Sequence, residues 1–145
     1  MIITFQILSR DKGDRLSYEQ LETTCIVISV TDPDSAPAQF HRNPQIKSVL
    51  RLSFEDVDTD TAGAMTKEDA ERIVSFVKRW KTKVPQIIVH CEAGISHSAG
   101  ICAALMLWLT GSDQAVFDDP QYRPNMGCNR LVLNEIQEEI DHAIR

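Results

Sequence analysis

The sequence has 145 residues, a length typical of one compact domain, and we expect residues 1–145 to form that single domain. Hydrophobic residues make up 43% and charged residues 25%, as in ordinary soluble globular proteins, so the composition does not indicate disorder. The formal net charge of −6 argues against nucleic-acid binding, which usually requires a basic face. An acidic protein can nevertheless bind an anion, because a single pocket can be locally positive.

Neither a membrane segment nor an export signal is predicted. The longest apolar run, 101–109, is about half the length of a membrane-spanning helix, and residues 1–5 lack the basic segment of a signal peptide. We therefore expect a cytoplasmic protein without a membrane partner. Its four cysteines include no Cys-x-x-Cys pair and are expected to be reduced. Cys25, Cys102 and Cys128 are predicted to be small buried hydrophobic residues.

The first half of the chain predicts three strands separated by loops. Residues 2–8 are typical of a short strand, and 16–21 of one or two helical turns. Residues 25–30 are β-branched and apolar, like a buried strand. A proline-containing loop over 31–44 precedes a third strand at 46–52, which an acidic loop follows.

The second half predicts helices around one further strand. Thr66-x-x-Asp69 is a capping-box pattern that opens a helix with apolar residues on one face, through Trp80. Residues 86–89 form a buried strand, 101–109 an apolar central helix that ends at Gly111, and 129–144 an amphipathic helix. This order predicts an α/β fold, with a mostly parallel central sheet flanked by helices. Ligands bind at the carboxyl ends of such strands, so a site is expected in the loop after Val89.

That loop combines a cysteine with glycines and serines. It runs His90-Cys91-Glu92-Ala93-Gly94-Ile95-Ser96-His97-Ser98-Ala99-Gly100, from a predicted strand into a predicted helix. A glycine-containing turn at a helix N-terminus points several N–H groups at one spot, and the helix dipole adds about half a positive charge there. The sequence therefore predicts a loop that binds phosphate or sulfate and stabilises a thiolate on Cys91.

Other interpretations of this loop have weaker support. An isolated cysteine is most often a packing residue, but the strand, the His-Cys pair, the glycines and the serines together favour a chemical role. Residues 94–100 lack the Gly-Lys-Ser/Thr ending of a nucleotide-binding P-loop. A zinc site built from His90, Cys91 and His97 has no fourth ligand at suitable spacing, so neither a metal nor an organic cofactor is predicted.

The same loop resembles the signature loop of the cysteine-dependent protein tyrosine and dual-specificity phosphatases, whose pattern is His-Cys-x-x-Gly-x-x-Arg-Ser/Thr. The matching positions are His90, Cys91, Gly94 and Ser98. His97 stands where the family has its arginine. A weaker similarity extends from about residue 46 to the C-terminus and includes a carboxylate loop upstream of Cys91 and the Pro-Asn pair at 124–125. Residues 1–45 match only as generic strands and loops.

The resemblance implies a role for each matching residue. Cys91 would attack phosphorus and form a phosphocysteine intermediate, while Ser98 would hydrogen-bond its sulfur. Ser98 could also serve as a helix N-cap. Asp56 would be the general acid that protonates the leaving oxygen, with Asp58 as the alternative and a solvated acidic turn as the plain interpretation. His90 would orient the loop. The phosphoryl oxygens would be held by backbone N–H groups of Glu92, Ala93, Gly94, Ile95, Ser96, His97 and Ser98.

His97 is the departure that matters for activity. An arginine at this position forks onto two phosphoryl oxygens and is always charged, whereas histidine is shorter and largely neutral near pH 7. The sequence is therefore compatible with a weak phosphatase, with a binder of phosphorylated partners, or with a damaged copy of the motif.

Three functions remain open at this stage. The first is hydrolysis of a phosphomonoester, with a phosphorylated protein or a small aryl phosphate as the partner. The second is a pseudophosphatase that binds phosphorylated partners without turnover. The third is rhodanese-like sulfur transfer, which also uses a cysteine in an anion-binding loop but which the His-Cys pair and Ser98 disfavour.

Overall fold

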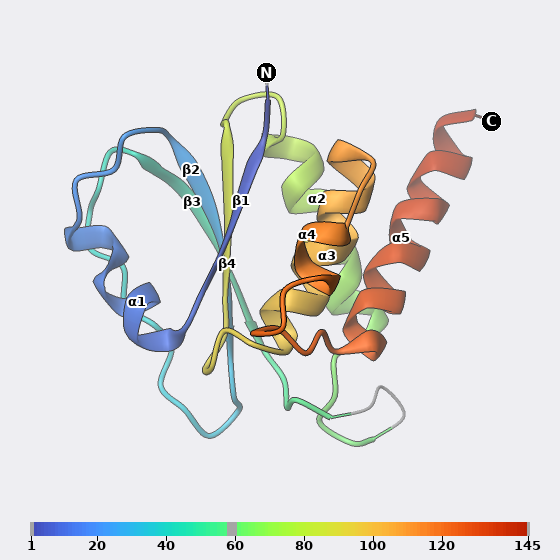
Figure 1. Cartoon of the computed structure of the whole chain (residues 1–145), viewed down its shortest axis with the longest axis horizontal. Coiled ribbons are helices and arrows are strands. Elements are labelled where there is room, and N and C mark those ends of the chain that lie inside the picture. The colour runs from blue at the N-terminus through green and yellow to red at the C-terminus, as the bar shows by residue number, and fades with distance from the viewer. Residues whose placement is uncertain (1, 58–60, 145) are drawn as a thin grey trace.

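A four-stranded parallel sheet forms the centre of the computed structural model, which describes residues 2–57 and 61–144 (Figure 1). The strand order is β1-β4-β2-β3, and every neighbouring pair is parallel. The strands are β1 (Thr4–Leu8), β2 (Cys25–Thr31), β3 (Ile46–Ser53) and β4 (Gln86–His90). The predicted α/β fold with a mostly parallel sheet is thus confirmed.

Helices cover both faces of this sheet. In Figure 1 the sheet is seen nearly edge-on, with α1 on its left and the other helices on its right. The left face carries α1 (Arg10–Arg15), which continues into a 3-10 turn. The right face carries α2 (Lys67–Trp80), α3 (His97–Thr110), α4 (Gln114–Phe117) and α5 (Met126–Ile144).

The interior strands explain why both faces need covering. All seven residues of β2 are buried. Ile26 and Ile28 pack with residues of α2, α3 and α5, whereas Val27 packs with Ile88 and Leu16 on the α1 side. Successive side chains of a strand point to opposite faces, so a continuous apolar strand needs a core on each side.

Two helix boundaries follow local rules in the sequence. Thr66 caps α2: its hydroxyl accepts a hydrogen bond from the Asp69 N–H, and the Asp69 carboxylate accepts one from the Thr66 N–H. Gly111 ends α3 in a left-handed conformation with φ of +85°. Both features confirm the prediction from sequence.

Two short helices differ from the prediction. The helical turns expected at 16–21 begin earlier, as α1 and a 3-10 turn over Leu16–Tyr18. Tertiary packing accounts for this shift, because Gly13 lies against the His90 ring and Leu16 is buried in the core on that face. The four-residue helix α4 was not predicted, since it is too short to show a period; Val116 holds it against Ala99 and Ala103.

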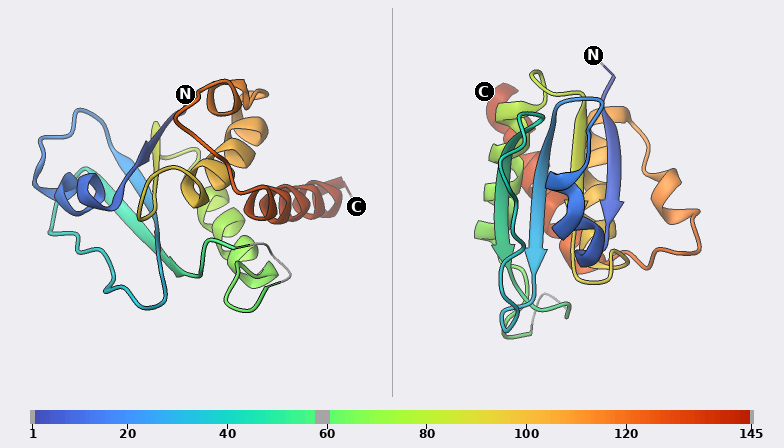
Figure 2. Two further views of the ribbon diagram at one scale, coloured as in Figure 1. Left: turned by 60° about the horizontal axis from the view of Figure 1, so that its bottom comes forward. Right: turned by 90° about the vertical axis from the view of Figure 1, so that its left-hand side faces the viewer.

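The carboxyl ends of all four strands lie at one edge of the sheet (Figure 2, right). The loop after β3 starts there, with the Phe54 N–H donating to the Thr31 carbonyl over 3.3 Å and the Glu55 N–H to the Gly63 carbonyl over 2.7 Å. The loop between β4 and α3 leaves the same edge. Two segments that the sequence keeps more than 30 residues apart are thereby brought together. Within the described residues, no helix is both long and apolar enough to cross a membrane.

Candidate active site

Residues 91–96, here named the Cys91 loop, join β4 to α3. The loop is fixed to the end of β1, because the Cys91 N–H donates to the Leu8 carbonyl over 3.3 Å and the Glu92 carbonyl accepts from the Arg10 N–H over 3.0 Å. Gly94 has φ of +72°, and a Cβ there would lie 2.8 Å from the Ser9 nitrogen. Only glycine suits both this conformation and this close approach.

The Cys91 sulfur lies at the start of this loop and is contacted by two polar groups. Its side chain is buried, with the Ser98 Oγ 3.0 Å away and the Gly94 N–H donating to the sulfur over 3.2 Å. Such donors stabilise negative charge on sulfur. The N-cap of α3 is Ser96, not Ser98, which is the second residue of the helix. The suggested capping role of Ser98 is therefore wrong, and its hydroxyl is directed to the sulfur instead.

The Cys91 loop and the first turn of α3 contain backbone donors without a described partner. Among the described residues, no acceptor is found for the N–H groups of Glu92, Ala93, Ile95, Ser96, His97 and Ser98. The last two belong to the first turn of the 14-residue helix α3, where N–H groups have no partner within the helix. Unsatisfied donors of this kind, at the positive end of a helix, are suited to an anion.

Asp56, the predicted general acid, lies beside the Cys91 loop. Its Oδ1 accepts hydrogen bonds from the Ser96 hydroxyl over 2.9 Å and from the Asn125 side-chain amide over 2.8 Å. The carboxylate is 44% exposed, so Asp56 is held in place but still reached by solvent. With Oδ1 engaged by these donors, a proton delivered to a leaving group would be carried on Oδ2. The alternative acid, Asp58, lies outside the described residues.

His97 occupies the arginine position of the motif and is almost completely buried. Its ring packs edge-on against Phe54, with ring centroids 4.9 Å apart. Its Nε2 is 3.4 Å from the Asp56 Oδ1, yet it makes no well-aligned hydrogen bond with any described residue. A buried nitrogen without a partner costs stability, and a bound acceptor at this place would relieve that cost.

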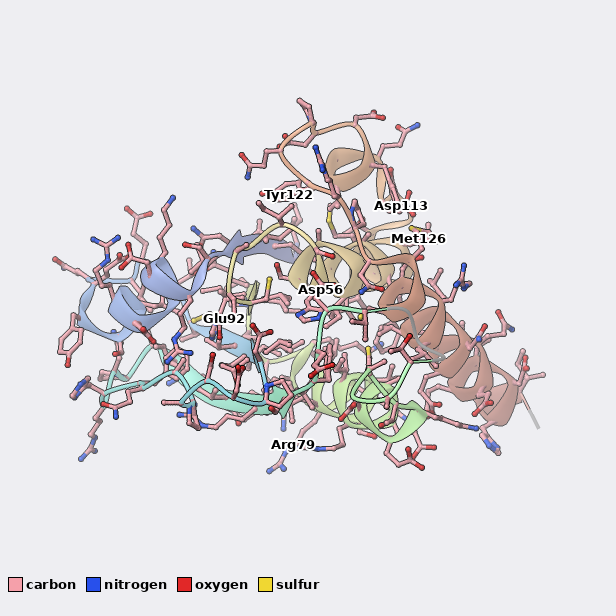
Figure 3. All side chains as sticks on the ribbon, turned by 90° about the horizontal axis from the view of Figure 1, so that it is seen from below. Asp56, Arg79, Glu92, Asp113, Tyr122 and Met126 are labelled. Atoms are coloured by element: carbon pink, nitrogen blue, oxygen red, sulfur yellow. The ribbon has the colours of Figure 1, made fainter. Side chains whose placement is uncertain are left out.

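A pocket of about 410 Å³ lies over the Cys91 loop, and we call it the nucleophile pocket. Cys91, Asp56 and His97 all line this pocket. A neighbouring pocket of about 640 Å³ shares Asp56, Ser96 and Arg123 with it. Figure 3 views this end of the molecule and labels Asp56 and Glu92 near its centre. The lining of the nucleophile pocket is Asp32, Asp56, Cys91, Glu92, Ala93, Ile95, Ser96, His97 and Arg123.

Two residues of this site were not predicted from the sequence. Arg123 lines the pocket from the connection between α4 and α5. Asn125, noted only as half of a Pro-Asn pair, holds Asp56 through its amide and the Cys91 loop through its N–H, which donates to the Ser96 carbonyl over 3.0 Å. The sequence signal for Arg123 was its position directly before the Pro-Asn pair. No local pattern connected Arg123 with Cys91.

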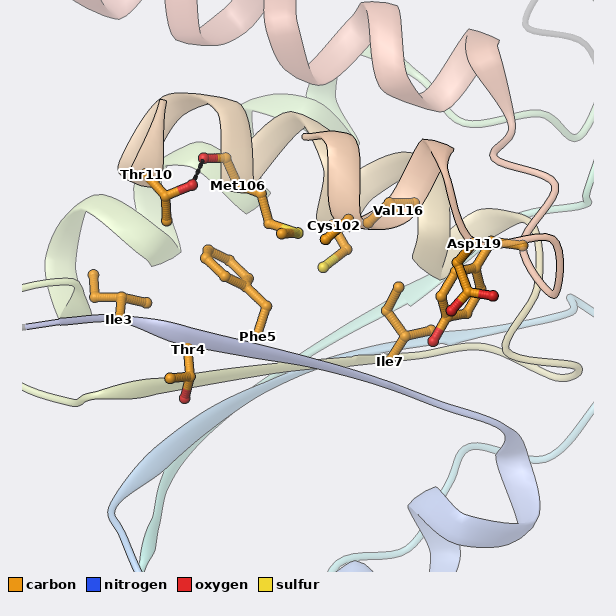
Figure 4. A pocket seen from close by; sticks show the side chains of 11 residues that line it. Ile3, Thr4, Phe5, Ile7, Cys102, Met106, Thr110, Val116 and Asp119 are labelled. Atoms are coloured by element: carbon orange, nitrogen blue, oxygen red, sulfur yellow. Dashed lines mark hydrogen bonds between the residues drawn. The ribbon is translucent and has the colours of Figure 1, made fainter. Parts of the chain in front are cut away.

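A separate pocket of about 400 Å³ contains none of the predicted site residues. It lies between β1, α3 and α4, with Phe5, Ile7 and Met106 among its walls (Figure 4). Cys102 also lines it, but burial raises the pKa of this thiol to about 12. The cysteine here is thus a protonated packing residue, and the pocket lacks convergent groups for catalysis.

The three side chains considered for zinc do not converge. The His90 ring lies beside Gly13 and Phe40, whereas the His97 ring lies against Phe54. Neither nitrogen of His90 has a partner among the described residues. Burial lowers the pKa of His90 to about 4, and the positive charge of Arg10 acts in the same direction. His90 is therefore neutral at pH 7.

This buried histidine predicts acid sensitivity. In the unfolded chain His90 is protonated below about pH 6.5, whereas in the folded protein it is protonated only below about pH 4. Acid between these values therefore favours unfolding. We expect the free energy of unfolding to fall by about 2 kcal/mol between pH 7 and pH 5 from this group alone. Urea unfolding of the protein and of the His90→Asn variant at both pH values measures this. The exposed His142→Asn variant is the control, and an unchanged pH dependence in His90→Asn would contradict the assignment.

The cysteines are expected to differ sharply in reactivity. Burial raises the pKa of Cys25 to about 11 and those of Cys102 and Cys128 to about 12, so these three are thiols at pH 7. Cys91 lines an open pocket and has donors at its sulfur. We expect iodoacetamide at pH 7 to alkylate Cys91 alone, with vanadate protecting it, as peptide mass spectrometry would reveal. Earlier labelling of another cysteine would remove Cys91 from its role as nucleophile.

Comparison with known proteins identifies the fold. No protein-family model matches the sequence, and no curated protein sequence matches it. Solved structures do match it. Human DUSP28 aligns over 95% of this chain and 94% of its own, with a TM-score of 0.62 and 16% identity. A mouse putative dual specificity phosphatase, complexed with zinc tungstate, aligns over 83% and 74%, with a TM-score of 0.55 and 21% identity.

A third matching structure belongs to a protein named as phosphatase-like. The human tyrosine phosphatase-like serine/threonine/tyrosine-interacting protein aligns over 84% of this chain and 80% of its own, with a TM-score of 0.54 and 19% identity. The chain therefore has the fold of the dual-specificity and protein tyrosine phosphatases. At these identities the likeness concerns the fold, and the chemistry has to be argued from the residues of the site.

Proposed function

We propose that the protein hydrolyses phosphomonoesters of the phosphotyrosine type through a phosphocysteine intermediate. The observation that carries this proposal is the Cys91 sulfur, in contact with Ser98 and the Gly94 N–H, in a loop whose other N–H groups have no described partner. A thiolate beneath an anion site is poised to attack the phosphorus of a bound phosphate ester. The partner would be a phosphorylated protein or a small aryl phosphate.

The reaction would proceed in two displacements. In the first, the Cys91 thiolate forms the S–P bond while the P–O bond to the leaving group breaks, and that oxygen takes a proton from Asp56. In the second, water attacks phosphorus, gives its proton to the Asp56 carboxylate, and releases phosphate and the thiolate. The Ser98 hydroxyl would stabilise the departing sulfur in this second step, as its 3.0 Å contact permits.

His97 should weaken this activity. An imidazole, packed edge-on against Phe54, cannot donate to two phosphoryl oxygens as an arginine fork does. Since a transition-state arginine is worth about 10³–10⁵ in rate in related phosphoryl transfers, a slow enzyme is expected.

Turnover assays separate the candidate reactions. We expect the protein to release p-nitrophenol from p-nitrophenyl phosphate, to be inhibited by vanadate, and to transfer no sulfur from thiosulfate to cyanide. Cys91→Ser should remove the activity. Sulfur transfer without phosphate release would replace the phosphatase by a rhodanese-like enzyme.

A mutation tests the assignment of the general acid. Asp56→Asn should slow turnover of an aryl phosphate with a poor leaving group by about 10²-fold, because that oxygen needs a proton. Turnover of an ester with a good leaving group should fall much less. Comparing kcat/KM across a series of substituted phenyl phosphates gives this dependence. Equal losses across the series would exclude Asp56, and Asp58→Asn would then be the variant to measure.

Binding without turnover is the second candidate function. The observation that favours it concerns residue 97. The His97 Nε2 lies 3.4 Å from the Asp56 Oδ1, and an imidazole beside a carboxylate gives a bound phosphate less positive charge than an arginine would. One structural neighbour is named as a phosphatase-like interacting protein, which is compatible with this role. A phosphotyrosine peptide bound with unchanged composition after long incubation would support the binder.

A further inference from the structure

The nucleophile pocket has an unusual charge balance for a phosphate site. Asp32, Asp56 and Glu92 line it; among the described residues Glu92 has the Arg10 guanidinium at 3.4 Å, whereas Asp56 has only the imidazole of His97, also at 3.4 Å. A phosphate ester brings about two further negative charges. Backbone donors and a helix dipole of about half a charge offset only part of this repulsion. A permanent cation is therefore needed within the pocket, and His97 is not one.

Arg123 is the only arginine or lysine among the described residues that line the nucleophile pocket. It also lines the neighbouring pocket, so its side chain stands where the two pockets meet. Its side chain is exposed, and among residues 2–57 and 61–144 no carboxylate pairs with its guanidinium. The group is thus available to an anionic ligand.

The backbone of Arg123 is fixed to the Cys91 loop. Its N–H donates to the Ile95 carbonyl over 3.0 Å, and two residues later the Asn125 N–H donates to the Ser96 carbonyl over 3.0 Å. Gly100 permits this contact, since a Cβ there would lie 2.4 Å from the Asn125 carbonyl oxygen. These backbone contacts fix the point from which the Arg123 side chain leaves the chain, next to the Cys91 loop.

A second observation points to a ligand at this place. The His97 Nε2 is buried, makes no hydrogen bond with any residue that the structure describes, and belongs to the same pocket. An oxyanion bound at the unpaired N–H groups of the Cys91 loop would offer acceptors both to this nitrogen and to a guanidinium that enters from the side of the α4–α5 connection.

We propose that Arg123 binds the phosphoryl group of the substrate and supplies the guanidinium that the Cys91 loop lacks. This inference rests on the proposed phosphate-directed function and assigns the cation of that site. Arg123 reaches the phosphate from a separate segment of the chain, so it offers charge and a planar pair of donors without belonging to the loop. Compensation is partial, because a donor outside the loop does not move with the sulfur and the loop amides as one unit.

Binding of orthovanadate tests this proposal independently of turnover. The dissociation constant is measured by calorimetry for the protein and for Arg123→Met, which keeps an unbranched stem and removes the charged guanidinium. We expect Arg123→Met to weaken vanadate binding by about 10- to 100-fold, as for loss of a charge-assisted hydrogen bond, and Arg123→Lys to weaken it less. Arg130→Met, an exposed arginine of α5 that lines neither pocket, is the matched control and should bind as the parent does.

A second arginine makes the test sharper. In the His97→Arg background a loop guanidinium is present, so the effect of Arg123→Met on vanadate binding should shrink to a few-fold. Unchanged binding in Arg123→Met would overturn the proposal, and so would an equal loss in both backgrounds, which would indicate a general field effect. If Arg123→Met weakens vanadate binding but the parent protein hydrolyses no aryl phosphate, the role of Arg123 stands and the enzymatic function is refuted. If the parent hydrolyses aryl phosphates and Arg123→Met changes neither turnover nor vanadate binding, the enzymatic function stands and the role of Arg123 is refuted.

Discussion

Replacing Cys91 by serine is expected to abolish turnover of aryl phosphates while leaving the phosphate site able to bind. In the proposed mechanism the Cys91 sulfur, which Ser98 and the Gly94 N–H contact, is the nucleophile, and a serine hydroxyl is a much weaker nucleophile than a thiolate. Loss of a nucleophile in other hydrolases costs about 10⁶-fold in kcat, so we expect kcat for p-nitrophenyl phosphate to fall by about 10⁴-fold or more. Because an inactive variant gives no rate to inhibit, the affinity of Cys91→Ser for phosphate is measured by calorimetry.

Cys102→Ser is the matched control for this experiment. Cys102 is equally buried but lies in the separate pocket of Figure 4, away from the Cys91 loop. The activity of the Cys102→Ser variant should equal that of the parent protein. Residual turnover in Cys91→Ser close to that of the parent would mean that the observed hydrolysis does not use this sulfur, and the phosphocysteine mechanism would be abandoned.

Replacing His97 by arginine should raise phosphatase activity by about 10²–10³-fold. A charged, bidentate donor at this position would stabilise the transferring phosphoryl group, and one well-aimed donor alone is worth about that factor. The new side chain must fit where the imidazole now packs against Phe54, next to the Asp56 carboxylate. Measuring kcat/KM on one aryl phosphate, with vanadate affinity alongside, separates binding from chemistry.

Two further variants interpret this result. His97→Lys adds charge without the planar fork and should recover less activity, while His97→Gln should recover none. Urea unfolding identifies any variant that fails to pack. Restored binding without restored turnover would place the defect elsewhere and favour the phosphate-binding function. No change in either quantity would mean that residue 97 does not act on the ligand.

Much of this architecture was readable from local patterns. Residues 25–30 and 86–89 are apolar on both faces, and they lie in the two interior strands, β2 and β4. The capping box at Thr66 and the glycine at 111 set helix ends as expected. The Cys91 loop was predicted because its glycines, its serine and its place between a strand and a helix act within about ten residues of chain.

Other features depend on distant segments. The start of the first helix at Arg10 is decided by the fit of Gly13 against His90, about 77 residues away, and α4 by the fit of Val116 on α3. The capping role suggested for Ser98 was wrong because the N-cap is Ser96, two residues earlier, which leaves the Ser98 hydroxyl free to contact sulfur. These are packing outcomes, and a single sequence carries no signal for them.

The class of fold, the candidate nucleophile Cys91 and the histidine at the arginine position can all be predicted from contiguous residues, because local conformation follows from backbone sterics and hydrogen bonding. Which side chains meet over Cys91 depends on how distant segments pack. Asp56 is held there by Asn125, and Arg123 by the carbonyl of Ile95, although these residues come from three separate connections. Their proximity arises because parallel strands direct their carboxyl ends to one edge, where the loops that follow must pack together.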